Sequence, residues 1–234
     1  MVKGKRITKK QLKEPDEFIT LTERAFIFIR EHSKKVAAAG GLLLVLIVAF
    51  IVFQMWDKKK EEEAAREFGV ATGLYERGIA QALEGSIQGE KDILAKFDEI
   101  ITKYPRTSSG RFSLLYRGNV YLKKGEFDEA IKAYTAFLDK SGKEKLYRYF
   151  AWEGLGHAHE GKKDYAKALE AYQKIVEGGE GYLLAEANLS IGYCYEKLGK
   201  SKEALESFKA FLSSNPKSSL SNVLLRKVSL LEKQ

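Results

Sequence analysis

The sequence predicts an all-α protein in which one N-terminal transmembrane helix precedes an α-solenoid of paired helices and a C-terminal capping helix. Three observations support this fold class. One long apolar segment near the N-terminus carries no charge. A spacing of glycine, alanine and an aromatic residue recurs three times in the rest of the chain. Proline occurs only three times among 234 residues, which favours helices over loop-rich folds.

The apolar segment runs from Val36 to Trp56, twenty-one residues without a charged side chain. At about 1.5 Å of rise per residue, such a helix covers about 30 Å, the thickness of a bilayer core. Lys34 and Lys35 border one end, and a tryptophan suits the interface at the other. A cleavable signal peptide fits less well, because 35 residues precede the run and no small-x-small cleavage site follows it. We therefore expect a retained transmembrane helix over residues 36–56.

Residues 1–35 form a basic tail, with ten Lys/Arg against five Asp/Glu and hence a net charge of +5. This excess predicts a cytoplasmic N-terminus, since basic residues stay on the cytoplasmic side of a membrane. The domain over residues 57–234 is then expected in the periplasm, with the protein single-pass in a bacterial inner membrane. That domain has thirty Lys/Arg against twenty-seven Asp/Glu, a net charge of only +3, which argues against nucleic-acid binding.

The tail has helical features of its own. Thr20 and Glu23 have the spacing of a capping box, which predicts a helix from about residue 21. Two interpretations stay open: a helix lying at the membrane interface, or one continuous helix that enters the membrane. One side of the expected helix is apolar and carries Leu21, Ala25, Phe28 and Ile29.

Beyond the span, three segments share one spacing: a glycine, an alanine twelve positions later, and an aromatic residue four positions further on. Glycine in one helix and alanine in the next allow two antiparallel helices to approach closely, while the aromatic ring fills the gap between helix pairs. Gly125 and Gly199 can adopt the left-handed conformation that ends the first helix. Each pair leaves an apolar face open, so neighbouring pairs must stack. The three sets are Gly118, Ala130 and Tyr134; Gly156, Ala168 and Tyr172; and Gly192, Ala204 and Phe208.

These segments resemble the tetratricopeptide repeat family over about residues 90–216, with periods of 38 and 36 residues. Trp152, Leu155 and Gly156 match the first-helix signature of that family, and Asn215-Pro216 matches its terminal proline. The expected organisation is a degenerate repeat at about 62–105, repeats at about 108–140, 146–178 and 182–216, and a capping helix at 218–232.

The two ends of the array depart from the repeat pattern. In the degenerate repeat, Phe97 and Pro105 keep the second-helix spacing, but the first helix is expected from Glu62 to Leu83 and is followed by the insertion GSIQGE. The capping helix is expected to cover the far end of the array with its apolar residues, which are Val223, Leu224, Val228, Leu230 and Leu231.

Patterns that would indicate catalysis or metal binding are weak. Residues 156–162 and 199–201 contain parts of a phosphate-binding loop, but both lack the complete motif and neither follows a strand. His157 and His159 point about 200° apart on a helix and cannot share a metal. Cys194, the single cysteine, is expected to be a small buried apolar residue. We therefore expect no enzyme, no metal site and no cofactor.

In the repeat family, the first helices line an inner groove, and the resemblance carries this role to twelve residues here. The groove is expected to be apolar at one end and acidic at the other, which suits extended apolar or basic peptides. A competing interpretation buries Phe112 and Leu115 against the long N-terminal helix. A carboxylate clamp at Asn119 is rejected, because Leu115 replaces the lysine that such a clamp needs. The groove residues are Phe112, Leu115, Asn119 and Leu122; Phe150, Glu153, His157 and Glu160; and Glu186, Leu189, Tyr193 and Glu196.

The whole chain, with its short tail, one span and degenerate repeats, is similar to the ancillary subunit of the bacterial Sec translocon. That resemblance implies partners among translocon subunits, a membrane-anchored periplasmic chaperone and exported client proteins. The expected function is a membrane-anchored interaction module that assists translocation or folding of exported proteins beside the Sec channel. The alternative is a scaffold subunit of another envelope assembly, for outer-membrane biogenesis or cell division. An enzyme, or its regulatory subunit, is the rival from a different class.

Overall fold

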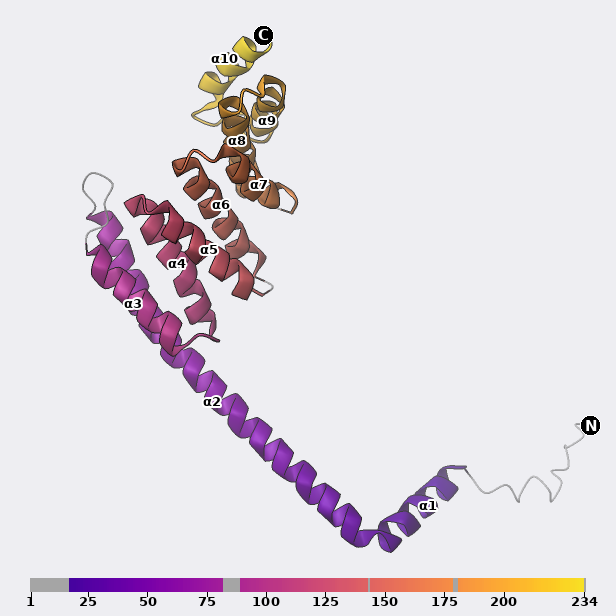
Figure 1. Cartoon of the computed structure of the whole chain (residues 1–234). Helices are drawn as coiled ribbons and strands as arrows, with labels where there is room; N and C mark the ends of the chain where they lie inside the picture. Colours follow the sequence, from indigo (N-terminus) through magenta and orange to yellow (C-terminus); the bar gives the residue numbers. More distant parts are fainter. Residues whose placement is uncertain (1–16, 82–88, 143, 179–180, 234) are drawn as a thin grey trace, which may run out of the picture. The chain divides into compact units, whose positions relative to one another are not determined.

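The computed structural model describes residues 17–81, 89–142, 144–178 and 181–233, which form ten α-helices and no strand (Figure 1). The chain divides into two compact units, residues 1–58 and 59–234. The helices are α1 (Glu17–Glu31), α2 (Ser33–Ala80), α3 (Glu90–Lys103), α4 (Ser108–Lys124), α5 (Phe127–Lys140), α6 (Lys145–Gly161), α7 (Tyr165–Val176), α8 (Gly181–Lys197), α9 (Ser201–Ser214) and α10 (Ser221–Leu231).

The first unit contains α1 and the beginning of α2. Helix α1 begins at Glu17, so Thr20 lies inside the helix and the expected capping box is wrong. Helix α1 ends at Glu31 and α2 begins at Ser33, so the tail and the apolar segment belong to two helices.

Helix α2 is 48 residues long, and by length and composition it is able to cross a membrane. Its apolar side chains between residues 42 and 56 are exposed, as illustrated by Leu44 at 64% and Phe50 at 61%. No new helix begins near Glu62, because residues 57–66 are good helix formers without glycine or proline. The expected end at Leu83, and all but the last two residues of the insertion GSIQGE, lie outside the described residues.

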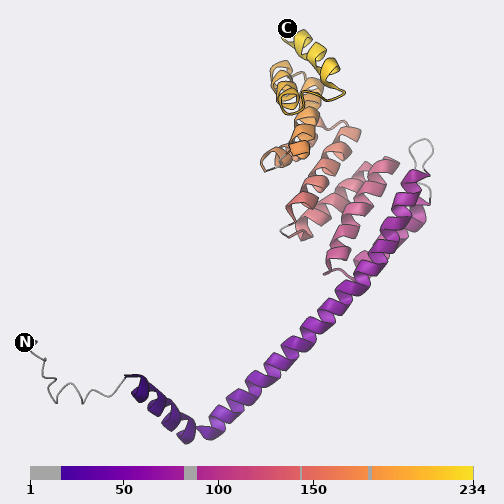
Figure 2. The ribbon, with the colours of Figure 1, turned by 180° about the vertical axis from the view of Figure 1, so that it is seen from behind.

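The second unit is a row of antiparallel helix pairs. Helices α4 and α5, α6 and α7, and α8 and α9 pack as pairs, and each pair contacts the next through α5 with α6 and α7 with α8. Figures 1 and 2 show these pairs following one another along the row. The end of α2 packs against α3 at the start of this row. Ala64 and Ala71 of α2 are buried there beside Ile93 and Phe97 of α3.

The repeated glycines receive the repeated aromatic rings. A Cβ atom on Gly118 would lie 2.6 Å from the ring of Tyr134, and one on Gly192 would lie 2.5 Å from the ring of Phe208. Tyr134 also fills the space beside Gly154 in the next pair. The aromatic residue therefore joins its own pair to the following one, which confirms the physical interpretation of the repeat spacing.

The turns inside the three pairs have the same hydrogen bonding. Gly125 and Gly199 have φ angles of +76° and +71°, so the predicted left-handed conformation is confirmed. In the middle pair this position is held by Lys163, with a φ angle of +60°. Its N–H donates to the carbonyl oxygen of Glu160 at 2.8 Å, and the N–H of Asp164 donates to that of His159 at 2.9 Å. This is the Schellman pattern that ends a helix, in which glycine is the favoured residue.

We expect the substitution Lys163→Gly to raise the free energy of unfolding by about 1 kcal/mol, because the left-handed conformation is strained for residues with a Cβ atom. The reverse change, Gly199→Lys, is expected to lower it by a similar amount. Urea unfolding followed by circular dichroism measures both. A Lys163→Gly protein that is less stable than the parent would contradict this account of the turn.

The capping helix covers the array with only part of its apolar residues. Leu224 is fully buried and Val228 is 8% exposed, whereas Val223 and Leu230 are 60% and 58% exposed. The expectation that all five apolar residues cover the end is therefore wrong for Val223 and Leu230. The helical period places residues 224, 228 and 231 on one side of α10 and leaves these two pointing away from α9.

Candidate peptide-binding surface

The first helices of the pairs lie side by side. Helix α4 contacts α6, and α6 contacts α8. The end of α2 joins this row, since Phe68 and Tyr75 of α2 place their rings 5.3 and 5.4 Å from that of Tyr116 in α4. The row of first helices therefore brings the predicted groove residues onto neighbouring elements.

Aromatic rings connect α2, α4 and α6 at this surface. The ring of Phe112 lies 6.3 Å from that of Phe68 and 4.3 Å from that of Tyr147. Tyr147 in turn contacts Phe150 at 6.4 Å. Phe112 thus packs partly against α2, while Leu115 is only 3% exposed and belongs to the core. Leu115 is therefore placed away from solvent and from any bound peptide.

Helix α6 carries five residues on one side at helical spacing, which we call the α6 stripe: Leu146, Phe150, Glu153, His157 and Glu160. The first two turns of α6 are apolar and open, with Leu146 of the stripe at 51% exposed, and Phe150 of the stripe and the neighbouring Tyr147 both at 39%. Its last two turns are polar. The change from apolar to acidic therefore runs along a single helix.

The end of the α6 stripe is a hydrogen-bonded group with Tyr172 of α7. The Nδ1 atom of His157 lies 3.1 Å from Oε2 of Glu160, and the Tyr172 hydroxyl donates to the same oxygen at 2.7 Å. The hydrogen bond to Glu160 raises the pKa of His157, and burial lowers it only in part. Burial acts to raise the pKa of Glu160, but the bonds from His157 and Tyr172 outweigh it and lower this pKa. The geometry thus favours a cationic histidine beside an anionic glutamate.

Stability should depend on pH through this pair. His157 has a folded-state pKa above its ordinary value of 6.5, so the pairing is complete below about that pH and is lost as the pH rises through the raised value. We expect the stability of the parent protein, relative to His157→Gln, to fall between neutral and mildly alkaline pH. Chemical unfolding at a series of pH values measures the difference. A difference that grows with rising pH would contradict the pairing.

Glu153 and Glu186 present two further carboxylates on adjacent first helices, α6 and α8. Among the described residues, neither carboxylate forms a hydrogen bond or an ion pair. Burial raises the pKa of Glu153, and the charge of Glu186 raises it further, although His157 lowers it. A cationic side chain from a ligand would relieve this repulsion, which makes the two carboxylates suited to a basic residue.

The capping helix occupies the corresponding surface of the last repeat. Lys227 of α10 donates to both carboxylate oxygens of Glu196, at 2.8 and 2.6 Å, and its ammonium group lies 5.0 Å from the ring centroid of Tyr193. Leu189 is 7% exposed and packs in the cluster that contains Leu224. Three of the four groove positions predicted in this repeat are therefore engaged within the chain.

In the first repeat, Asn119 is also engaged, because its side-chain oxygen accepts a 2.7 Å hydrogen bond from the Tyr134 hydroxyl. Leu122 is partly buried and packs against the core cluster that contains Leu115 and Tyr134. His157 has the equivalent position in the second repeat, and its Nδ1 atom lies 2.8 Å from the Tyr172 hydroxyl, which accepts from the cationic ring while it donates to Glu160. The residue at this position thus holds the hydroxyl of the repeated tyrosine in both repeats.

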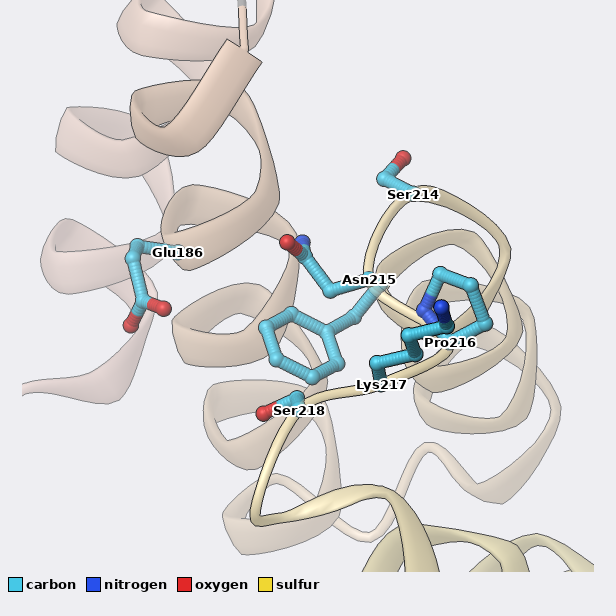
Figure 3. A pocket seen from close by; sticks show the side chains of 7 residues that line it. Glu186, Ser214, Asn215, Pro216, Lys217 and Ser218 are labelled. Carbon is cyan, nitrogen blue, oxygen red and sulfur yellow. The ribbon is translucent and has the colours of Figure 1, made fainter.

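A shallow pocket lies beside Glu186. Figure 3 shows Glu186 on one side and the turn from Ser214 to Ser218 on the other. The turn is held by the Ser218 N–H, which donates to the carbonyl oxygen of Asn215 at 3.1 Å. Glu186 is the one predicted groove residue of this repeat that α10 and the core leave available.

Cys194 is fully buried, as the sequence predicts. Its thiol lies 3.6 Å from Oε1 of Glu160, and burial together with that charge raises the pKa of the thiol to about 12. This thiol is therefore protonated and unreactive. In the part of the chain that the structure describes, no group of three or more His, Cys, Asp or Glu side chains could hold a metal ion.

Three residues of this surface, Leu146, Tyr147 and Lys227, are not among the predicted groove residues. Leu146 and Tyr147 lie one turn before Phe150, so helical spacing was a sufficient signal for both. Lys227 had no local signal, because its contact with Glu196 depends on how α10 packs.

The stacked pairs and their row of first helices define a helical-repeat protein. Comparison with known families supports this: two tetratricopeptide repeat models match, one over residues 115–182 and the other over residues 185–218. Residues 115–182 and 185–218 therefore match tetratricopeptide repeats, which indicate a protein-protein interaction module. No curated protein matches the chain.

Among solved structures, a crystal structure of MamA protein is similar, with 16% sequence identity, a TM-score of 0.57, and coverage of 72% of this chain and 82% of that one. A second crystal structure of MamA has 16% identity, a TM-score of 0.48, and coverage of 62% and 87%. At this identity, the first likeness shows the solenoid fold alone.

Proposed function

We propose that this protein is a membrane-anchored interaction module that binds polypeptides on its row of first helices. Helix α2 provides the anchor, since its first half is apolar, uncharged over residues 36–56 and exposed. The basic tail supports a cytoplasmic N-terminus and a periplasmic repeat domain in a bacterial inner membrane.

The α6 stripe is the observation that carries the binding proposal. Leu146, Tyr147 and Phe150 offer an open apolar contact, and one turn further on Glu153 faces the same side beside Glu186. An extended peptide with an apolar or aromatic residue followed by lysine or arginine matches both features. The other predicted groove residues pack in the core, hold the hydroxyl of the repeated tyrosine or contact α10. The proposed site is therefore centred on the second repeat.

The biological role that fits such a surface is assistance to the translocation or folding of exported proteins beside the Sec channel. Its support is the resemblance of the chain, with its tail, span and degenerate repeats, to the ancillary translocon subunit. Emerging chains expose apolar segments before they fold, and the α6 stripe is suited to them. The alternative is a scaffold subunit for outer-membrane biogenesis or cell division, which would use the same surface for a permanent partner.

Cross-linking followed by affinity purification of the full-length protein from mildly solubilised membranes tests this role. Residues 57–234, which lack the apolar segment, serve as the control. We expect Sec channel subunits and a periplasmic chaperone to be recovered with the full-length protein and lost with the control. Recovery of a different envelope complex would retain the interaction module and remove translocation from the account. Recovery of neither would contradict the proposal.

A further inference from the structure

We propose that α1 is an interfacial helix that lies at the bilayer surface, with one side among the lipids of the leaflet that contacts the tail. This inference rests on the proposed anchor. Its first support is exposure: three apolar side chains on one side of α1 are open, namely Phe26 at 68%, Phe28 at 57% and Ile29 at 50%. An apolar surface of this kind is costly in water, so it requires a cover.

The side chains of α1 separate into two sides. At about 100° per residue, Ala25, Phe26, Phe28 and Ile29 fall within one half of the helix. The charged residues fall on the other half: Glu23, Arg24, Arg30 and Glu31. An apolar side opposite a charged one is the pattern of a helix that lies in the membrane interface.

The position of α1 next to the apolar segment identifies the cover as lipid. The ring of His32 stacks on that of Phe28, with centroids 4.7 Å apart, and α2 begins immediately afterwards at Ser33. Only four residues, 32–35, then separate the end of α1 from the uncharged segment that starts at residue 36. Once that segment crosses the bilayer, the end of α1 is held close to the bilayer surface.

Crossing the bilayer is excluded for α1 itself. Its 15 residues are fewer than the roughly 20 that a transmembrane helix needs. Placing Arg24 and Arg30 in the hydrocarbon core would also be strongly unfavourable. The tail adds charge complementarity: residues 1–35 have a net charge of +5, from ten basic and five acidic residues, which attracts anionic headgroups. A protein partner would need no such excess.

The test is spin labelling of the full-length protein in liposomes that contain anionic lipid. Single cysteines are introduced by Ala25→Cys on the apolar side, Glu23→Cys on the charged side and Val45→Cys in the apolar segment of α2. The native Cys194 is fully buried and stays unlabelled. We expect labels at positions 25 and 45 to be accessible to oxygen and shielded from a water-soluble nickel chelate, with the reverse pattern at position 23.

Each outcome has a distinct meaning. A label at position 25 that is open to the chelate, with position 45 in lipid, overturns the interfacial helix and leaves the anchor standing. Position 45 open to the chelate overturns the anchor itself. A label at position 25 that is shielded from both reagents indicates a protein contact and also overturns the inference.

A matched pair of substitutions adds a second readout. Ile27 and Ile29 are the same residue type on opposite sides of α1. With the label at position 25, Ile29→Ser is expected to increase the exposure to the chelate at least threefold, whereas Ile27→Ser leaves it unchanged. Equal effects of the two changes would contradict an oriented helix. Removing the anionic lipid is expected to increase the exposure as well.

Discussion

Replacing Tyr134 by alanine is expected to lower the free energy of unfolding by about 3–5 kcal/mol. The side chain is fully buried and its ring fills the space against Gly118 in its own pair and Gly154 in the next. Glycine has no side chain that can move into the cavity, so the structure collapses little. Urea unfolding of the full-length protein in detergent, followed by circular dichroism, measures the change.

Tyr134→Phe is the matched control, because it keeps the ring and removes only the hydroxyl that donates to Asn119. Its expected cost is about 1 kcal/mol. If the alanine variant lost no more stability than the phenylalanine variant, the ring would not join the two pairs.

The double substitution Tyr147→Ala and Phe150→Ala is expected to reduce the capture of bound polypeptides at least tenfold. Exposed aromatic residues near the centre of a binding surface commonly dominate the binding energy, and a tenfold loss corresponds to about 1.4 kcal/mol. The measurement is the amount of cross-linked polypeptide recovered per molecule of full-length protein from membranes.

Val176→Ala controls for the general loss of apolar surface. Val176 is 39% exposed, as are Tyr147 and Phe150, but it lies at the end of the second helix α7. Capture is expected to stay at the parental level in this variant. Equal losses in the two proteins, or no loss in either, would show that α6 is not the binding helix.

The repeat architecture could be predicted because residue identity alone encodes its main contact. Gly118 and Tyr134 meet because one lacks a side chain and the other has a large flat one, and the same spacing recurs twice more. The left-handed turns at Gly125 and Gly199 could be predicted for the same reason, because glycine adopts this conformation without strain. Lys163 has the same left-handed conformation without a glycine, since the hydrogen bonds of the turn impose it against the local preference of the residue.

The candidate site could be predicted only in part. Helical spacing and family resemblance identify the first-helix positions, but they do not show which are buried. Leu115 and Leu189 pack into the core because neighbouring helices cover them, and Glu196 is engaged by Lys227 from outside the repeats. Such contacts depend on how helices distant in the sequence pack together. The continuity of α2 could have been predicted, because no residue between the apolar segment and the repeats interrupts a helix.

We propose that polypeptides bind to the row of first helices, and above all to the α6 stripe. Photo-cross-linking from single positions in the membrane-embedded protein tests it most directly, with a photoreactive amino acid in place of Phe150 or, as the control, of Lys174 on the exposed surface of α7. We expect discrete protein adducts from position 150 and none from position 174. Adducts from position 174 alone, or equal adducts from both, would contradict it.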